Sequence, residues 1–447
     1  MLKSKSFRVL FVASSLVLLT LQSHAQNDYN QIEGDSIAMS LEECLEFAKI
    51  NSITLKQAQL SIDNSIADEL TASGVFLPSV SAAIGQNFIA TPLVSGTKAS
   101  YSGSYGVDLS MPIYSGGANR ASLEQSKINS EMAELSLAEQ ENSLEIAVTE
   151  VFVQMLYMME QIEVAKNGLV LSEKSLERGK DYLEVGYINK SELALLESAK
   201  ASNEYDVVVA QSTLSNLQVM LKQLLEISQD VYIGAAAPEL SNAVILSPIY
   251  SVGEVYNSAL EFRPEIAYSK LSISAAELDV KIAKAGYLPT VSVSAGAGIS
   301  HNSSSDYTFS GQMRNNFTTS IGASVSVPIF SNYRNKVATV KAQNSVNSAS
   351  LSLTDAEKEL YQTIETLHNN ASNAQMQYAA SDVKLKAAQV SLELLTEQYN
   401  EGMKNIIELL TEQDNYLDSS QEYLTNKYQF ILNRALLEYY KTDLIKL

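Results

Sequence analysis

Four stretches of the sequence alternate between apolar and small polar residues, and this alternation limits the folds open to the chain more than any other feature. In the clearest stretch, Phe317, Ile321 and Val325 fall at odd positions, while Ser320 and Gly322 fall between them. A period of two residues is typical of a β-strand with one apolar and one polar face. We predict four such strands, at about residues 79–90, 101–114, 290–300 and 316–330.

This alternation fits either a half-buried soluble sheet or a membrane β-barrel. Three observations favour the barrel. First, the polar face consists mainly of Ser and Gly. Second, the stretches of about 13 residues exceed the roughly 9–11 that a membrane-crossing strand needs. Third, Tyr101, Tyr105 and Phe317 lie on the apolar side, as aromatic residues at membrane interfaces do. Four strands cannot close a barrel, and lipid does not tolerate open sheet edges. The barrel must therefore be shared by two, three or four chains, and the residues alone do not choose among these numbers.

The chain also repeats itself after roughly 210 residues, which indicates a duplicated domain rather than a short solenoid repeat. Leu77-Pro78-Ser79-Val80 corresponds to Leu288-Pro289-Thr290-Val291, and the turn residue Gly186 corresponds to Gly402. Each half reads as a helix, two strands and a long helical hairpin. We therefore predict a first repeat over residues 26–226, an irregular connector over 227–250, and a second repeat over 251–447.

The predicted hairpins begin with two long stretches that contain no Pro, residues 118–182 and 334–399. Their apolar residues recur at a mean spacing of 3.5, the period of a coiled coil. Each stretch is long enough for a helix of ~100 Å, which far exceeds a bilayer. These helices must project into water, and they turn back at two tips, residues 182–190 and 399–405.

Residues 1–25 are predicted to be a secretory signal peptide. Lys3, Lys5 and Arg8 precede an apolar stretch of about 13 residues, and Ser23-His24-Ala25 forms a cleavage site of the small-x-small type. The alternative is a membrane anchor, but a helix of that length covers only ~20 Å of a ~30 Å hydrocarbon core. A signal peptide directs the long helices to the periplasm.

The composition argues against several classes of function. A formal net charge of −20 disfavours nucleic-acid binding, which requires a basic surface. One Cys and three His leave little for a disulfide or metal centre, and the common catalytic and nucleotide-binding motifs are missing. We therefore predict that the chain is not an enzyme and has no catalytic residues, no bound metal and no cofactor.

In their order and duplication, several short motifs resemble the TolC-like outer-membrane efflux protein family over nearly all of the chain after residue 25. They are a capped opening helix at 41–60 with its partner at 252–271, the two Leu-Pro motifs, Met-Pro-Ile-Tyr-Ser at 111–115 with Val-Pro-Ile-Phe-Ser at 327–331, and the two glycine turns. The resemblance implies a mixed α/β membrane protein. In that family, three chains share a 12-stranded antiparallel outer-membrane β-barrel with four strands from each chain, which continues into a periplasmic α-helical coiled-coil barrel.

The resemblance also implies a pore gate at the periplasmic end. Aligned on the glycine of the second tip, the constricting Tyr and Arg of the family fall on Tyr399 and Lys404, and their partners fall on Ser191 and Glu192. Contacts of this kind would hold a closed state. Lys404 departs from the family because Lys lacks the bidentate fork of Arg.

A second implied gate element is a ring of carboxylates. Glu408 matches the first acid of the family's pair, whereas Thr411 stands at the second. Three copies of Glu408 around one axis would favour cations at the pore mouth, but a solvated helix face is an equally good explanation. The segments that resemble the family's adaptor-docking tip are Val185, Gly186 and Tyr187 on the first turn and Glu401, Gly402 and Met403 on the second.

These features predict a passive homotrimeric exit duct of a tripartite efflux pump, embedded in outer-membrane lipid and opened when a periplasmic adaptor and an inner-membrane pump dock. It would expel small molecules such as drugs, toxic compounds or ions. Two alternatives remain. The same duct could serve type I protein secretion, or the chain could be a periplasmic coiled-coil scaffold. The sequence does not identify the transported substrate.

Overall fold

The computed structural model describes residues 37–90, 99–227, 233–236 and 248–446. The predicted signal peptide and most of the predicted connector at 227–250 lie outside these described residues. By its internal contacts the chain divides into two units. Unit 1 comprises Met1–Ile53, Glu141–Ala259 and Thr363–Leu447, and unit 2 comprises Thr54–Gln140 and Leu260–Gln362. Each unit takes segments from both halves of the sequence, and the boundaries of the repeats stay a prediction.

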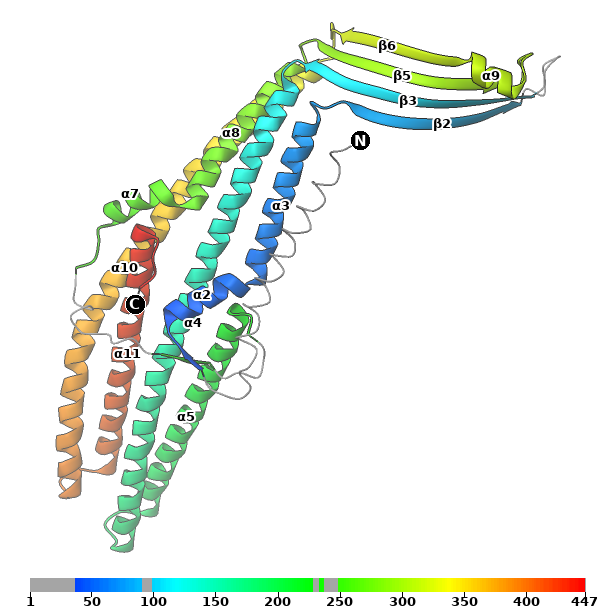
Figure 1. The fold of residues 1–447 in the computed structure, drawn as a ribbon. Helices are drawn as coiled ribbons and strands as arrows, with labels where there is room; N and C mark the ends of the chain where they lie inside the picture. The colour runs from blue at the N-terminus through cyan, green and yellow to red at the C-terminus, as the bar shows by residue number, and fades with distance from the viewer. Residues whose placement is uncertain (1–36, 91–98, 228–232, 237–247, 447) are drawn as a thin grey trace, which may run out of the picture. The chain divides into compact units, whose positions relative to one another are not determined.

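Unit 2 contains a four-stranded antiparallel sheet with the order β2-β3-β5-β6 (Figure 1). Its strands are β2 (Ser79–Ala90), β3 (Ala99–Ser115), β5 (Thr290–Asn302) and β6 (Phe317–Ser326). The register places apolar residues beside apolar residues and polar residues beside polar residues on neighbouring strands. One apolar row runs through Ile84, Tyr105, Ile299 and Phe317, and one polar row runs through Ser81, Asp108, Gly296 and Ser320. The alternation in the sequence therefore becomes two chemically distinct faces.

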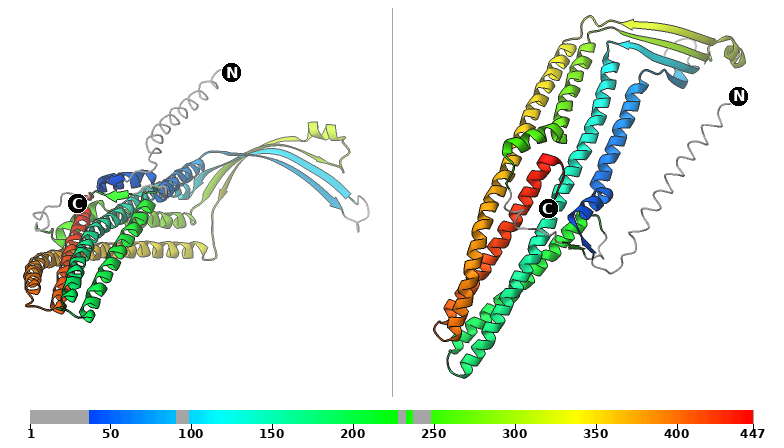
Figure 2. Two further views of the ribbon diagram at one scale, coloured as in Figure 1. Left: turned by 90° about the horizontal axis from the view of Figure 1, so that it is seen from below. Right: turned by 60° about the vertical axis from the view of Figure 1, so that its left-hand side comes forward.

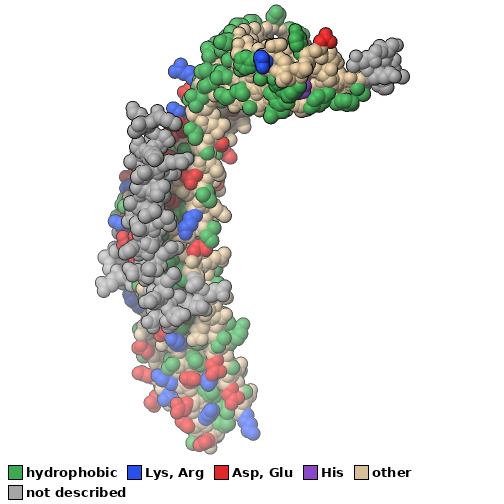
Figure 3. Space-filling model, turned by 45° about the vertical axis from the view of Figure 1, so that its right-hand side comes forward, with side chains coloured by type: hydrophobic (Ala, Val, Ile, Leu, Met, Phe, Trp, Pro, Cys, Tyr) green, Lys and Arg blue, Asp and Glu red, His purple; other side chains and the backbone are tan. Residues whose placement is uncertain are grey.

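The apolar face of this sheet is largely uncovered. Ile84 is 76% exposed and Ile321 is 87% exposed, and Figure 3 shows hydrophobic side chains gathered over the strands. A soluble sheet normally packs its apolar face on a core. The described sheet also ends in two edges, β2 and β6, that each have one neighbour.

Proline shapes the ends of the strands. The strand β6 ends at Ser326, four residues before the predicted end at 330. Pro328 follows, and proline has no N–H to donate to a neighbouring strand. Pro112 lies within β3, where the pairing with β5 shifts register between Pro112 and Tyr114. A short helix, α9 (Phe309–Asn315), interrupts the connection between β5 and β6.

The opening helix of each half is divided in two, which differs from the single helices predicted at 41–60 and 252–271. The first half has α2 (Leu41–Asn51) and α3 (Ile53–Gly74), and the second has α7 (Val252–Phe262) and α8 (Pro264–Ala285). Arg263 is extended, with φ −66° and ψ 126°, because the following proline disfavours helical geometry. Ser52 takes a similar conformation without a proline.

Two helical hairpins provide most of unit 1 (Figure 2). The long helices α4 (Ala118–Glu184) and α10 (Arg334–Asn400) have 67 residues each and extend into unit 2. They turn back into α5 (Lys190–Leu224) and α11 (Ile406–Thr442). A parallel pair of short strands, β1 (Ile37–Met39) and β4 (Ile233–Ala235), also belongs to unit 1.

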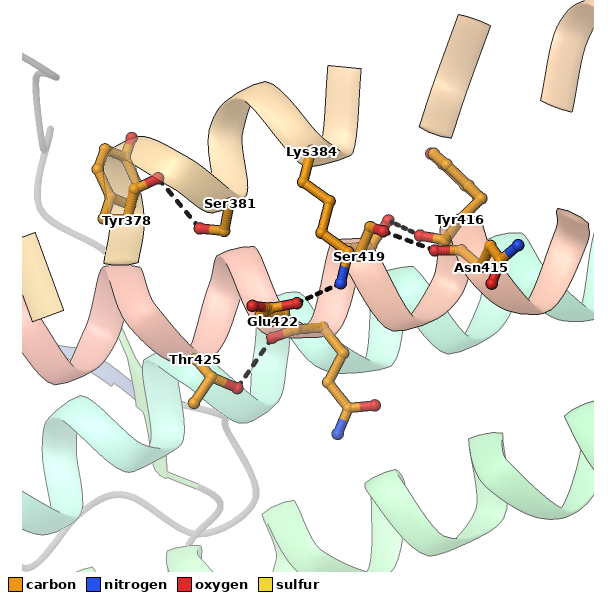
Figure 4. A network of polar contacts seen from close by, with 10 residues as sticks. Tyr378, Ser381, Lys384, Asn415, Tyr416, Ser419, Glu422 and Thr425 are labelled. Carbon is orange, nitrogen blue, oxygen red and sulfur yellow. Dashed lines mark hydrogen bonds and ion pairs between the residues drawn. The ribbon is translucent and has the colours of Figure 1, made fainter. Parts of the chain in front are cut away.

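The residues of the predicted heptad stripe are buried or half-buried. In α4, Val148 and Met155 are fully buried, and in α10 the corresponding positions Ile364 and Ala371 are fully buried. Polar contacts join the helices of the second hairpin (Figure 4): Lys384 Nζ lies 2.5 Å from a Glu422 carboxylate oxygen. No helix among the described residues is both long enough and apolar enough to cross a membrane.

Candidate functional site: the hairpin tips

The two tips of unit 1 share one local construction. Gly186 and Gly402 adopt positive φ values of 75° and 74°, a conformation that side chains other than glycine disfavour. Asn189 then caps α5 by accepting from the N–H groups of Ser191 and Glu192. Asn405 caps α11 in the same way, by accepting from the Glu408 N–H at 2.9 Å.

Tyrosines join the two tips within one chain. The Tyr187 hydroxyl donates to the Gly402 carbonyl at 3.1 Å, and the Tyr182 hydroxyl donates to the Asn400 carbonyl at 3.2 Å. The ring centroids of Tyr182 and Tyr187 lie 5.1 Å apart. The absence of a side chain at Gly402 is needed here, because an added Cβ would overlap the Tyr187 hydroxyl. We call this pair of hydrogen bonds the tyrosine tie.

Tyr399, the predicted constricting residue, lies behind this tie. It is 2% exposed and packs in a cluster with Leu196, Ile406 and Leu409. Its buried hydroxyl has no hydrogen-bond partner among the described residues. Burial raises the pKa of this hydroxyl, and the nearby Tyr182 and Glu192 raise it further. Tyr399 is therefore positioned near the first tip without a polar contact to it.

The charged gate candidates pair within their own tips. Lys404 Nζ lies 2.8 Å from Glu408 Oε2, and each side chain is 40% exposed. On the first tip, the Asn189 N–H donates to Glu192 Oε2 at 2.8 Å. Among the described residues the structure gives no hydrogen bond or ion pair between Lys404 and Ser191 or Glu192. Contacts between different chains lie outside a single protomer, and the gate assignment stays a prediction.

The residues predicted to dock an adaptor are exposed at the ends of the hairpins. Val185 is 77% exposed, Met403 is 68% exposed and Tyr187 is 55% exposed. Gly186, Glu401 and Gly402 are also exposed. Exposed apolar side chains at the end of a hairpin form a surface that suits a protein partner.

The sequence reasoning missed three residues that build the tips, namely Tyr182, Asn189 and Asn405. The two asparagines had a readable signal. Each stands three residues before a glutamate, the spacing of a helix cap, as Asn189 with Glu192 and Asn405 with Glu408. Tyr182 had none, because its partner carbonyl lies 218 residues further along the chain.

Comparison with known proteins identifies the family. The sequence pattern of the family described as "Outer membrane efflux protein" matches residues 45–225 and 255–439. Outer membrane protein TolC of Vibrio cholerae is 20% identical over 96% of this chain and 93% of that protein. TolC of Escherichia coli is 25% identical over 54% of this chain and 50% of that protein, so this chain spans about half the length of that relative in the alignment. The alkaline protease secretion protein AprF of Pseudomonas aeruginosa is 24% identical over 67% of this chain and 62% of that protein.

The fold matches solved outer-membrane proteins. The outer membrane protein VceC of Vibrio cholerae superimposes with a TM-score of 0.75, at 16% identity, over 90% of this chain and 96% of that one. This similarity confirms the predicted fold class, in which four strands of each chain contribute to an antiparallel barrel that continues into a long α-helical part. The chain belongs to the outer membrane efflux protein family and resides in the outer membrane, with its helical hairpins in the periplasm.

Proposed function

We propose that three copies of this chain form a passive outer-membrane exit duct of a tripartite efflux pump. The observation that carries the proposal is the sheet of unit 2, whose apolar face is exposed and whose two edges are unpaired in the described residues. In lipid, both edges need strand partners. Further copies of the same sheet supply those partners, and the family resemblance selects three copies and 12 strands.

The proposed duct is not an enzyme, and it requires no cofactor or metal. Its hairpins form the wall of a water-filled periplasmic tunnel, and its tips form the closed end. A periplasmic adaptor docks on Val185, Gly186, Tyr187, Glu401, Gly402 and Met403, and the tips then separate. Small molecules leave through the open tunnel, and the inner-membrane pump selects which molecules enter it.

The similarity to a protein whose name describes alkaline protease secretion supports a second candidate, a type I protein secretion duct. Both candidates use the same channel, and the difference lies in the pump that docks. Identification of the adaptor and pump that co-purify with the chain separates them.

Conductance in planar bilayers tests the duct and its gate. Because Lys404 and Glu408 form an ion pair, substitution of one should change the cation preference of the pore in the opposite direction to substitution of the other. Glu408→Gln removes a carboxylate from each copy and lowers the preference for cations, whereas Lys404→Ala leaves that carboxylate uncompensated and raises it. Glu438→Gln, on the same helix but near its other end, is the matched control.

A chain that forms no trimers and no conducting pores would contradict the duct itself. Pores whose cation preference is unchanged by both substitutions would contradict only the gate assignment of Glu408 and Lys404. The same recordings test Tyr399→Phe. This variant removes the hydroxyl of the predicted constricting residue, and a raised open probability supports that role for Tyr399.

A further inference from the structure

A cavity of about 460 Å³ lies at one end of the sheet of unit 2, beside α9. It is at the end of the sheet where β3 begins and β5 ends, whereas α4 follows the opposite end of β3. Side chains from both strands, from the following connection and from α9 line it, among them Tyr101, Tyr105, His301, Tyr307, Phe309 and Gln312. None of the gate or tip residues contributes to it.

His301 is the central polar group of this cavity. It is 7% exposed, and its Nδ1 has no hydrogen-bond partner among the described residues. Aromatic rings surround it: its ring centroid lies 4.9 Å from that of Phe309 and 5.5 Å from that of Tyr101. It lies over Gly103, where any side chain would overlap the imidazole. Glycine at that position makes room for the imidazole.

The neighbouring side chains of Gln312 and Gln86 have hydrogen-bond partners, whereas His301 Nδ1 has none among the described residues. Gln312 accepts from the Asn302 N–H at 2.7 Å and donates to the Tyr307 carbonyl at 2.8 Å. Gln86 donates to the Tyr105 hydroxyl at 2.8 Å and accepts from the Tyr101 hydroxyl. A buried polar atom without a partner costs about 1–3 kcal/mol. Nδ1 is buried and packs against Gly103, so a molecule in the cavity contacts His301 through other atoms of its ring.

The cavity lies on the apolar face of the sheet. Tyr101, Gly103 and Tyr105 occupy the odd positions of β3, and His301 continues the apolar row of β5 after Ile299. In the proposed duct this face contacts lipid, and the end of the sheet away from the helices lies at the outer surface. The cavity would therefore face the head groups of the outer leaflet, the level at which aromatic girdles occur in barrels. This step rests on the proposed function.

The lining selects the chemistry of the ligand. Aromatic rings stack on the apolar faces of sugar rings, and Ser, Asn and imidazole groups hydrogen-bond sugar hydroxyls. The described lining residues include Ser303, Ser305 and Asn302, and none of the described ones is Lys or Arg. Phosphate sites usually supply such cations. We propose that this cavity binds the sugar head group of an outer-leaflet glycolipid, which stacks on the aromatic rings and contacts the exposed part of His301.

The chain has no Trp, so a single introduced Trp reports on the cavity without background. The probe is Tyr307→Trp, because Tyr307 lines the cavity and is 64% exposed. The full chain is purified in the sugar-free detergent lauryldimethylamine oxide and titrated with dodecyl maltoside, a sugar-headed lipid analogue. We expect a saturable change in Trp emission. Tyr333→Trp, a 68% exposed position of unit 2 outside the cavity lining, serves as the control and should show no saturable change.

His301→Phe in the Tyr307→Trp background keeps a ring in place and removes the imidazole nitrogens. It should weaken the apparent affinity at least tenfold, and Phe309→Ala should do the same by removing a stacking ring. An equal response at Tyr333→Trp, or an affinity unchanged by both variants, would overturn the proposal. A saturable response to lysophosphatidylglycerol but not to the maltoside would overturn the assignment to sugars.

Channel conductance of the same variants separates this proposal from the duct. Conducting trimers that show no response to the maltoside contradict the sugar site and leave the duct intact. Chains that neither assemble nor conduct contradict the duct. The His301→Phe variant should conduct like the unsubstituted chain, because its cavity lies on the face of the sheet opposite the polar row.

Discussion

Removal of the tyrosine tie should open the periplasmic end of the proposed duct. The double variant Tyr182→Phe/Tyr187→Phe deletes both hydroxyls that join the tips and keeps both rings. A net hydrogen bond of this kind contributes about 0.5–1.5 kcal/mol. Tyr187 is 55% exposed, so water competes for its hydroxyl and its contribution falls near the lower end. The two bonds together should contribute about 1–2 kcal/mol, which corresponds to roughly a 5- to 30-fold change in the ratio of closed to open tips in each chain.

Single-channel recordings in planar bilayers measure this ratio as open probability. Each single variant should show an intermediate open probability, and because the two rings are in contact, their effects need not add. Tyr205→Phe is the matched control, because Tyr205 lies on α5 away from the tips and is 68% exposed. An open probability of the double variant equal to that of Tyr205→Phe would refute the tie as a closing contact.

Three further predictions address the core, the alkaline limit and the lumen. Ile364→Ala in the buried stripe of α10 should cost about 2–5 kcal/mol of unfolding free energy, whereas Leu351→Ala, 72% exposed on the same helix, should cost less than about 0.5 kcal/mol; chemical denaturation measures both. Burial and the hydrogen bond to Glu160 raise the pKa of Tyr428 above its ordinary value of about 10. The unfolded chain therefore loses this proton first, so thermal stability should decline as the pH rises above about 10, and Tyr428→Phe should lessen that decline. Asp108→Asn removes the carboxylate from the polar row of the sheet and should lower the cation preference of the open pore in bilayer recordings, whereas Ser104→Ala on the same strand should not.

Periodic features of the sequence predicted periodic features of the fold. The spacing of 3.5 placed Val148 and Ile364, both fully buried, in a stripe whose residues are all buried or half-buried. The period of two residues predicted that Ile84 and Ser81 lie on opposite faces of the sheet. The register confirms that Ile84 belongs to the apolar row and Ser81 to the polar row. Such patterns are readable because burial of a helix face or strand face repeats the same physical demand at every turn or pleat.

Features that depend on approach between distant segments were not readable. Nothing near Tyr187 in the sequence indicates that its hydroxyl reaches Gly402, and nothing near His301 indicates that three rings enclose it. The break before Pro264 had a local signal, the proline itself, but the equivalent break at Ser52 had none. The predicted gate residues are harder still, because in the proposed trimer their partners would belong to other chains.

The distribution of buried side chains indicates which part of the chain is stable before assembly. The hairpins of unit 1 have their own core, with fully buried residues such as Phe152, Met155 and Leu221 from both helices of the first hairpin. On the apolar face of the sheet in unit 2, by contrast, the side chains of Ile84, Ile321 and Val325 are each at least 65% exposed. Burial of one such side chain contributes about 1.5–3 kcal/mol, and for the sheet this contribution becomes available only in lipid. The helical part can therefore fold in the aqueous periplasm, whereas the strands gain their stability at the membrane, where the neighbouring copies of the proposed trimer would complete their edges.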